Sequence, residues 1–228
     1  MKILKRDSLQ EGGFAGLKEH RLVKSPGIFG VNGNNDGSCP GLGNFVYLAD
    51  ARFMPHGETH MHSHHEIDVI SVMVEGQISH EGSLAHGQDL GSNDVQVQRA
   101  GGEGFSHNEV NPDNDWNRLI QLWVLPEVAG MAADYKVYTP VVGESTRIYG
   151  GNSSVDFPAT TIIDIALLEN GQQIDVAGPY LIYITRGAGT VNAQPVEDGD
   201  LIQGDSVRFE ASCDVQLIVI HIEKQQGE

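Results

Sequence analysis

Four of the ten histidines of the chain lie within six residues, in the segment THMHSHHEID at positions 59–68. Side chains alternate between the two faces of an extended strand, so His60, His62 and His64 would share one face while His65 points to the other. Two imidazoles at positions i and i+2 can reach one metal ion, and imidazole is a ligand for Fe, Cu, Ni and Zn. The segment predicts a metal site, although a merely solvated histidine tract fits the same pattern.

A second segment supplies further ligands at the same spacing. The stretch AGGEGFSHNEVNPDN contains His107 and Glu109, again two positions apart. Together with His62 and His64 they offer three nitrogens and one oxygen, which leaves positions on an octahedral ion for water or substrate. The strand and the glycine turns between the two segments predict a hairpin that brings the pairs face to face. By spacing alone, His60 and His62 are an equally good first pair.

The segments around these residues have the composition of β-strands. β-branched and aromatic residues are concentrated in short stretches that Gly, Asn, Asp and Pro bound. Helical periodicity is scarce, and EVAGMAADYK at 127–136 is a short candidate helix. Many short strands at close intervals predict an all-β protein built of sandwiches or barrels. The predicted strands include 43–53, 67–82, 94–100 and 118–125.

The chain divides into two similar halves between Pro126 and Pro140. Each half carries a hairpin with a glycine turn, VMVEGQISHEG in the first and YITRGAGTVNA in the second. We therefore expect two β-barrel domains in tandem, an N-terminal metal-binding domain at 1–130 and a C-terminal domain at 131–228. Because the second half contains a single histidine, His221, we expect the C-terminal domain to lack metal ligands.

The charge and the apolar pattern disfavour several function classes. The 228 residues include 14 basic and 31 acidic side chains, a net charge of −17. That field repels a nucleic-acid backbone or an anionic membrane, and no basic patch offsets it, so we expect no direct binding to either. No stretch approaches about 18 continuous apolar residues, and the start of the chain has no signal-peptide core. The two cysteines lie far apart in sequence, which is typical of reduced thiols in a cytoplasmic protein.

The two histidine segments resemble the cupin motifs, and more closely those of the pirin family of bicupins. In HMHSHHEIDVISVMVEG the pair His62 and His64 is followed by the acidic Asp68 and an EG turn, and GFSHNEVN has the spacing G-x2-H-x3-N. The resemblance is strong over 41–136 and weaker over 160–222. This chain departs from the family at His65, where pirins usually carry arginine, and at Asp68, where they usually carry glutamate.

The resemblance implies two tandem cupin, jelly-roll-like β-barrels, of which the second has lost its metal. It implies that His62, His64, His107 and Glu109 are the ligands, since alignment to the EG turn favours His64 over His60. Asp68 would then lie behind the ligands rather than among them. The ion would be one divalent transition metal, with Fe favoured and Ni, Cu, Mn or Zn possible.

The family also implies an activity. Pirin-like proteins suggest a quercetin 2,3-dioxygenase-type reaction, in which a small-molecule flavonol or related enol meets dioxygen at the metal. Glu109 is then the candidate catalytic base as well as a ligand, because both roles need a group beside the bound oxygen. The alternative is a non-enzymatic regulatory or redox-sensing protein that acts through a protein partner.

For two further pairs of residues, the sequence predicts only whether the side chains are exposed or buried. His80 and His86 fall in the turn region after the first hairpin, where we expect solvated side chains. Trp116 and Trp123 lie in or beside a predicted strand, so we expect them in the core or in a pocket wall.

Overall fold

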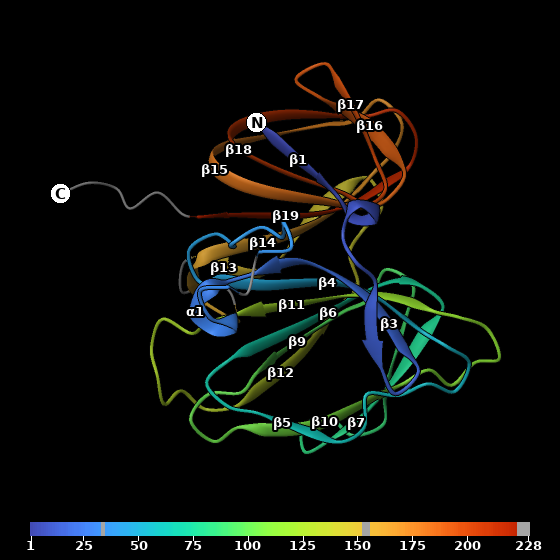
Figure 1. Cartoon of the computed structure of the whole chain (residues 1–228), viewed down its shortest axis with the longest axis vertical. Helices are drawn as coiled ribbons and strands as arrows, with labels where there is room; N and C mark the ends of the chain where they lie inside the picture. The colour runs from blue at the N-terminus through green and yellow to red at the C-terminus, as the bar shows by residue number, and fades with distance from the viewer. Residues whose placement is uncertain (33–34, 152–155, 223–228) are drawn as a thin grey trace. The chain divides into compact units, whose positions relative to one another are not determined.

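The secondary structure is almost entirely β-strand, which confirms the predicted all-β class (Figure 1). Within the part of the chain that the structure describes, two single turns are helical, the 3-10 turn η1 (Arg6–Ser8) and α1 (Pro26–Phe29). No helix among the described residues is long and apolar enough to cross a membrane. The computed structural model describes residues 1–32, 35–151 and 156–222.

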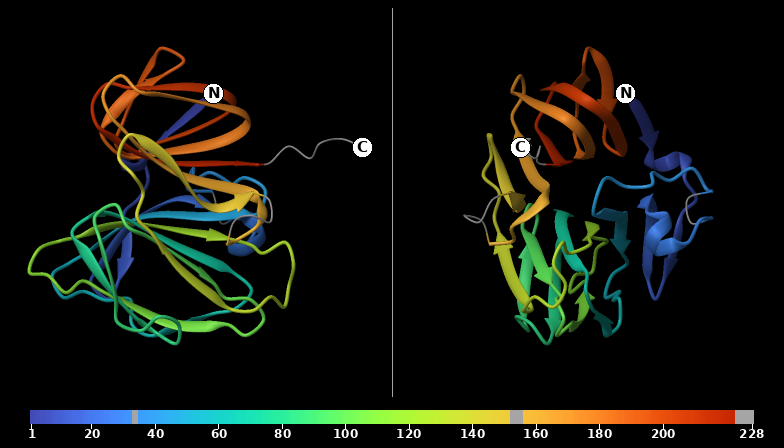
Figure 2. Two further views of the ribbon diagram at one scale, coloured as in Figure 1. Left: turned by 180° about the vertical axis from the view of Figure 1, so that it is seen from behind. Right: turned by 90° about the vertical axis from the view of Figure 1, so that its left-hand side faces the viewer.

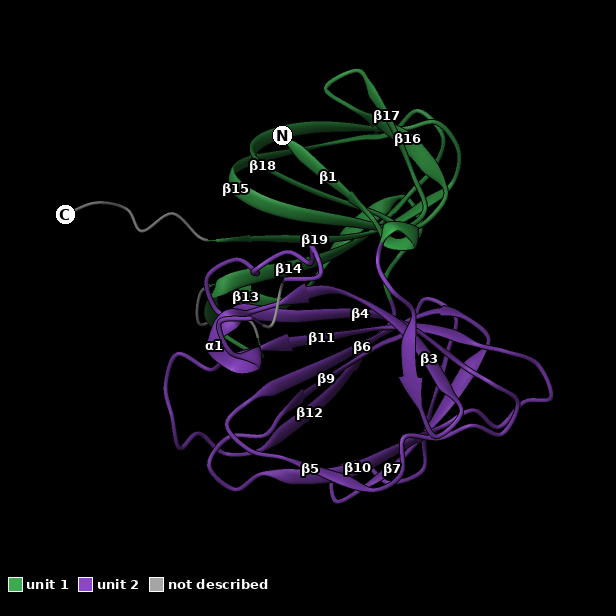
Figure 3. Ribbon diagram, viewed as in Figure 1, with its two compact units in different colours: residues 1–8, 140–228 green, residues 9–139 purple. Residues whose placement is uncertain are grey.

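The chain folds into two compact units, coloured separately in Figure 3. Unit 2 comprises Leu9–Thr139, and unit 1 comprises Met1–Ser8 together with Pro140–Glu228. The division differs in two places from the expected boundary after residue 130. Residues 1–8 belong to unit 1 because β1 (Lys2–Lys5) pairs with β18 (Asp200–Ala211), and Figure 2 shows the first strand beside the C-terminal strands.

Residues 131–139 belong to unit 2, and the helix predicted at 127–136 is not formed. β12 (Asp134–Tyr138) pairs instead with β9 (Val95–Arg99) along five residues. Gly130 has a φ of 76°, in the left-handed region where a helix cannot continue. Strand pairing therefore overrides the helical propensity of the Ala and Met residues in this segment.

Unit 2 contains two antiparallel sheets whose side chains enclose its interior. The central strands of the larger sheet are buried on both faces, which explains the continuous apolar runs in their sequences. The larger sheet has the order β12, β9, β6 (Asp68–Glu75), β11 (Arg118–Val124), β4 (Phe45–Phe53), β3 (Leu17–Lys24) and β2 (Gly12–Phe14). The smaller sheet has the order β5 (His62–His64), β10 (Phe105–Val110), β7 (Gln77–Gly82) and β8 (Gln88–Gly91).

Unit 1 has one eight-stranded sheet with its own core. Tyr180, Phe209 and Leu217 are among the side chains that are almost completely buried there. The strand order is β13 (Glu144–Gly151), β14 (Ala159–Leu168), β19 (Val215–Ile222), β15 (Gln173–Arg186), β18, β16 (Ala188–Val191) and β17 (Gln194–Glu197), with β1 added at β18.

Candidate metal centre

Strands β5 and β10 bring three histidines together. The two strands pair antiparallel with His107 opposite His62 and Phe105 opposite His64, so all three imidazoles project from one face. The Nε2 atom of His107 lies 3.1 Å from Nε2 of His62 and 3.2 Å from Nε2 of His64. The ligand atoms of the three residues all lie within 4.8 Å of one another. Three ring nitrogens that converge in this way could hold a metal ion.

The outer nitrogens of these rings have partners that suit metal binding. Nδ1 of His62 lies 2.9 Å from the carbonyl oxygen of His60 and donates to it, which leaves the Nε2 lone pair facing the centre. The Gln98 amide lies 3.3 Å from Nδ1 of His107, while Oε1 of Gln98 is buried without a hydrogen-bond partner. Rotation of this amide by about 180° lets Oε1 accept from Nδ1–H and frees the Nε2 lone pair of His107. The residues present therefore fit a bound cation.

Burial keeps two of the rings neutral. It lowers the pKa of His64 to about 4, with a smaller contribution from His62. Burial lowers the pKa of His107 to about 2, and the neighbouring His62, His64 and His80 add to the effect. Only a neutral imidazole has a lone pair for a metal, so the structure holds these rings in the form that binds a cation at neutral pH.

Glu109 follows His107 by two positions, and it lines a cavity that the three histidines also line. Its Oε1 atom accepts hydrogen bonds from Ser71 Oγ at 2.6 Å and from Gln96 Nε2 at 2.7 Å. Burial raises the pKa of the Glu109 carboxyl to about 7, although the hydrogen bonds from Ser71 and Gln96 oppose the shift. Among the described residues, the group with metal-binding geometry contains the three histidines and does not include Glu109. The carboxyl group can exchange a proton near neutral pH.

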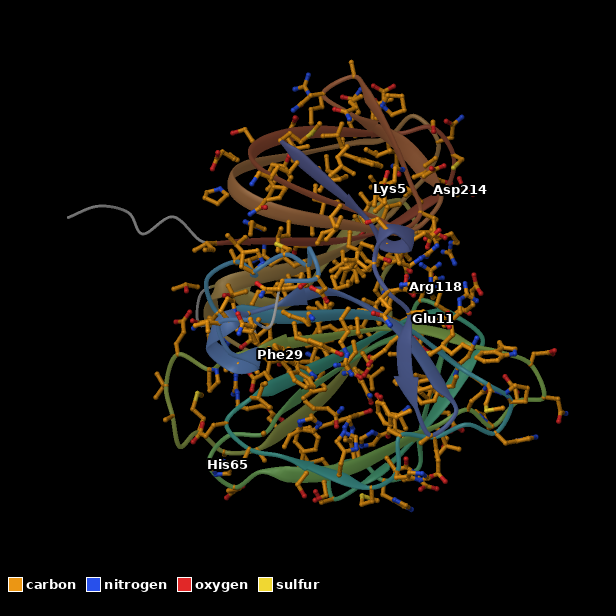
Figure 4. The ribbon with its side chains drawn as sticks, viewed as in Figure 1. Lys5, Glu11, Phe29, His65, Arg118 and Asp214 are labelled. Carbon is orange, nitrogen blue, oxygen red and sulfur yellow. The ribbon has the colours of Figure 1, made fainter. Side chains whose placement is uncertain are left out.

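The other residues singled out by sequence lie outside the cluster. His60 is exposed, with a φ of 61°, and its Nδ1 lies 3.4 Å from the Glu58 carboxylate. His65, labelled in Figure 4, has Nε2 3.1 Å from the carbonyl oxygen of Gly102. Asp68 is 1% exposed on β6 and forms an ion pair with an arginine of β9. The geometry thus places His64, rather than His60, beside His62 and His107.

His80 is a buried residue that the sequence interpretation missed. Solvated side chains were expected in this region, but His80 is 0% exposed, and its Nε2 lies 2.9 Å from the carbonyl oxygen of Leu84. Its ring centroid is 5.5 Å from those of both His107 and Tyr135. The sequence did contain a signal for this burial, because His80 lies two positions after the apolar Ile78 on β7 and therefore faces the same, inward side. His80 packs behind the three-histidine cluster.

The three histidines line a cavity of about 400 Å³ in unit 2. Trp123 forms part of its wall, as expected, and stacks on Tyr47 with ring centroids 4.3 Å apart. The Trp123 ring is 5.9 Å from that of His64, so the aromatic wall adjoins the histidines. Trp116 is 43% exposed, so the expectation of a core or wall position is wrong for this residue. The cavity volume and mainly apolar lining suit a small organic molecule.

Comparison with known proteins bears on what such a cavity is for. The family model described as Pirin matches residues 39–124. The match bears out the resemblance to the pirin family over this segment. A candidate quercetin 2,3-dioxygenase from Zymomonas mobilis is 35% identical over 81 residues, which are 36% of this chain and 34% of the relative. The quercetin 2,3-dioxygenase of Escherichia coli K12 is 28% identical over 76 residues, 33% of this chain and 32% of that protein.

These matches span about a third of the length of the curated relatives, whereas the structural match extends over the whole chain. The bacterial pirin YhhW from Escherichia coli, solved in complex with nickel(II), superposes with a TM-score of 0.81. The alignment covers 97% of this chain and 98% of YhhW at 16% sequence identity. At this identity the likeness establishes the fold, and it confirms the predicted all-β class of two tandem cupin barrels.

Proposed function

We propose that this pirin-family chain is a metal-dependent dioxygenase of the quercetin 2,3-dioxygenase type, acting on a flavonol or a related enol. The observation that carries the proposal is the convergence of three imidazoles on one wall of an apolar cavity that also contains the Glu109 carboxyl. Relatives named as quercetin 2,3-dioxygenases support the reaction class.

In this proposal His62, His64 and His107 would hold one divalent transition metal ion, and Glu109 would provide the fourth, oxygen ligand. Iron is the ion that we propose, and nickel is the second choice because the pirin YhhW was solved with nickel(II). A bound ion would supply Lewis acidity toward a substrate hydroxyl and a template for two reactants, the enol and dioxygen, in one pocket.

Glu109 would take the proton of the substrate enol. Its pKa of about 7 suits a base that works near neutral pH, because a general base is most effective when its pKa lies close to the working pH. Ser71 and Gln96 both bind Oε1 and fix the orientation of the carboxyl group. We therefore assign the proton to the other oxygen, Oε2.

The apolar walls would position the rings of the substrate and exclude water. Leu17, Phe53 and Leu119 line the cavity together with the stacked rings of Tyr47 and Trp123. A flat aromatic molecule can stack against such rings with an offset geometry. Exclusion of water strengthens each electrostatic interaction at the reacting atoms.

The test begins with metal content. Purified wild type, His62→Ala and His107→Ala are compared by elemental analysis, with His65→Ala as the matched control because His65 lies outside the cluster. We expect loss of metal in the first two variants and retention in the control. Unchanged metal content in both His62→Ala and His107→Ala would refute the ligand assignment.

The second step tests the reaction. Flavonol is added to metal-loaded protein without oxygen, oxygen is then admitted, and the flavonol absorbance band is followed. We expect the band to decay in wild type and to persist in His107→Ala. No metal-dependent decay across a panel of flavonols would favour the alternative, a metal-dependent regulatory or redox-sensing protein that acts through a protein partner.

Two further parts of the proposal concern unit 1 and location. We propose that unit 1 is a cupin-like barrel without a metal. Its single histidine, His221, has Nε2 3.3 Å from the Asp164 carboxylate. We also propose a cytoplasmic location, which is supported by Cys39 and Cys213 being thiols rather than a disulfide.

A further inference from the structure

A row of directly opposed residues crosses the cavity side of the larger sheet. The strand register aligns Arg21 with Ala49, Ala49 with Gln121, Gln121 with Ser71, and Ser71 with Gln96. Opposed residues in antiparallel strands project from the same face, so all five side chains point to one side. Ser71 and Gln96 bind the Glu109 carboxyl at one end of this row. Arg21 stands at the other end.

The surroundings of Arg21 hold its guanidinium at the cavity wall. Its Nε lies 2.7 Å from Glu19 Oε1, and Nη2 contacts the same oxygen. Tyr47 donates its hydroxyl to Glu19 Oε2 at 3.1 Å, so both oxygens of this carboxylate are engaged. The Glu19 side chain is 5% exposed while that of Arg21 is 44% exposed. A guanidinium has five N–H donors, so Arg21 keeps donors for a ligand beyond those that face Glu19.

The cavity therefore has two polar ends and an apolar middle. Arg21 is the one lysine or arginine among the described residues that line it. Arg21 and Ser71 are three strands apart, which corresponds to about 14 Å between their backbones at the usual strand spacing. Ala51, Phe53 and Leu119 supply apolar surface of the cavity lining. An elongated ring system with oxygens at both ends matches this distribution.

We infer that Arg21 determines substrate specificity by binding a hydroxyl or carboxylate oxygen that the substrate carries away from its enol. The inference rests on the proposed function, because it takes the enol to lie at the histidine end. Glu19 compensates the charge of Arg21, so a neutral phenol oxygen is an adequate acceptor. Glu19 is a positioning residue that holds the guanidinium directly, and the Tyr47 hydroxyl holds Glu19 in turn, while the Tyr47 ring lines the cavity.

The experiment compares two flavonols that share the enol and differ in their other oxygens. Quercetin carries further ring hydroxyls and 3-hydroxyflavone carries none. Binding to metal-loaded protein is measured without oxygen from the quenching of tryptophan fluorescence, because Trp123 lines the cavity. We expect wild type to bind quercetin roughly tenfold more tightly than 3-hydroxyflavone, the effect of one hydrogen bond to a charged group. Arg21→Met should bind the two alike.

Arg52→Met is the matched control. Arg52 lies on β4, next to Arg21's strand in the same sheet, and its side chain is 43% exposed and paired with Glu75. It alternates with the cavity-lining residues Ala51 and Phe53, so it projects from the opposite face. This variant removes an equally exposed cation and should keep the preference of wild type for quercetin.

A second variant separates a loss of substrate binding from a loss of folding. Arg21→Met leaves the buried Glu19 carboxylate without its cation, which can destabilise the unit. The double variant Glu19→Gln, Arg21→Met removes both charges, and it should also bind the two flavonols alike. A tenfold preference that persists in both Arg21 variants would overturn the role of Arg21.

The remaining outcomes separate this inference from the function on which it rests. If wild type binds both flavonols with equal affinity, Arg21 forms no hydrogen bond with a substrate oxygen away from the enol. The proposed substrate class is unaffected by that result. If metal-loaded wild type binds neither flavonol, the substrate class is wrong and the role of Arg21 is refuted with it. Metal content, measured in the same samples, reports separately on the histidine cluster.

Discussion

Replacement of Glu109 by glutamine tests the electrostatics of the site directly. The wild-type carboxyl is buried, and its pKa is about 7 instead of the ordinary 4.5. A difference of 2.5 pKa units at about 1.36 kcal/mol per unit corresponds to about 3 kcal/mol. Glutamine has the same shape, can accept at Oε1 from Ser71 and Gln96, and cannot ionise. The variant therefore isolates the cost of ionising this buried group.

The sign of the effect follows from proton linkage. Because the folded state raises the pKa of Glu109, it binds the proton more readily than the unfolded state does between pH 4.5 and 7. The wild-type free energy of unfolding should therefore fall as the pH rises through this range and then level off. Glu109→Gln lacks this loss. Its stability relative to wild type should increase by about 3 kcal/mol between pH 4.5 and pH 8.

Urea unfolding with a chelator present measures this difference in the metal-free protein. Both tryptophans of the chain, Trp116 and Trp123, lie in unit 2 with Glu109, so their fluorescence reports on that unit. Glu103→Gln removes an exposed carboxylate six positions before Glu109 in the sequence and controls for the change in net charge. Parallel pH profiles for wild type and Glu109→Gln would show that the carboxyl is not perturbed, and the assignment of Glu109 as a base would lose its support.

Three further outcomes are expected. Arg118→Met should lower the free energy of unfolding of unit 2 by about 3–5 kcal/mol in the same urea assay, since it removes the cation that contacts both oxygens of the buried Asp50 carboxylate (Arg118 is labelled in Figure 4). Gln98→Leu should weaken metal binding roughly tenfold or more in a chelator competition, because it removes the polar partner of Nδ1 of His107. Phe209→Ala should destabilise unit 1 by about 3–5 kcal/mol through a core cavity, measured by calorimetry, and leave the metal affinity unchanged.

The histidine cluster was accessible from sequence because it depends on local geometry. The two-residue period of a strand places His62 and His64 on one face, and the same period relates His107 to Glu109. The antiparallel pairing of two short strands then brings the faces together. The alternation along β7 points His80 inward, but its packing against the Tyr135 ring was not accessible, because β12 supplies that ring from a distant part of the sequence.

Long-range pairing explains the other differences between sequence and structure. The first strand joins unit 1 through pairs such as Lys2 with Gln203, which no local pattern indicates. The polar row that ends at Arg21 depends on the register of five strands, including a shift in β3 between Arg21 and Val23. Such a register is set by the whole sheet, so the sequence alone gives no reason to connect Arg21 with the histidine site.

The charges that line the cavity explain why Glu109 and Arg21 have different roles. The rings of His64 and His107 stay neutral at pH 7, so they supply lone pairs but no charge to offset a divalent cation. The charge of Glu19 is already offset by Arg21, which leaves Glu109 as the acid able to provide negative charge at the histidine end. A carboxyl whose pKa is close to 7 can ionise when a cation arrives and can stay protonated when none is present. Burial of this one acid therefore makes the charge of the site depend on its occupant.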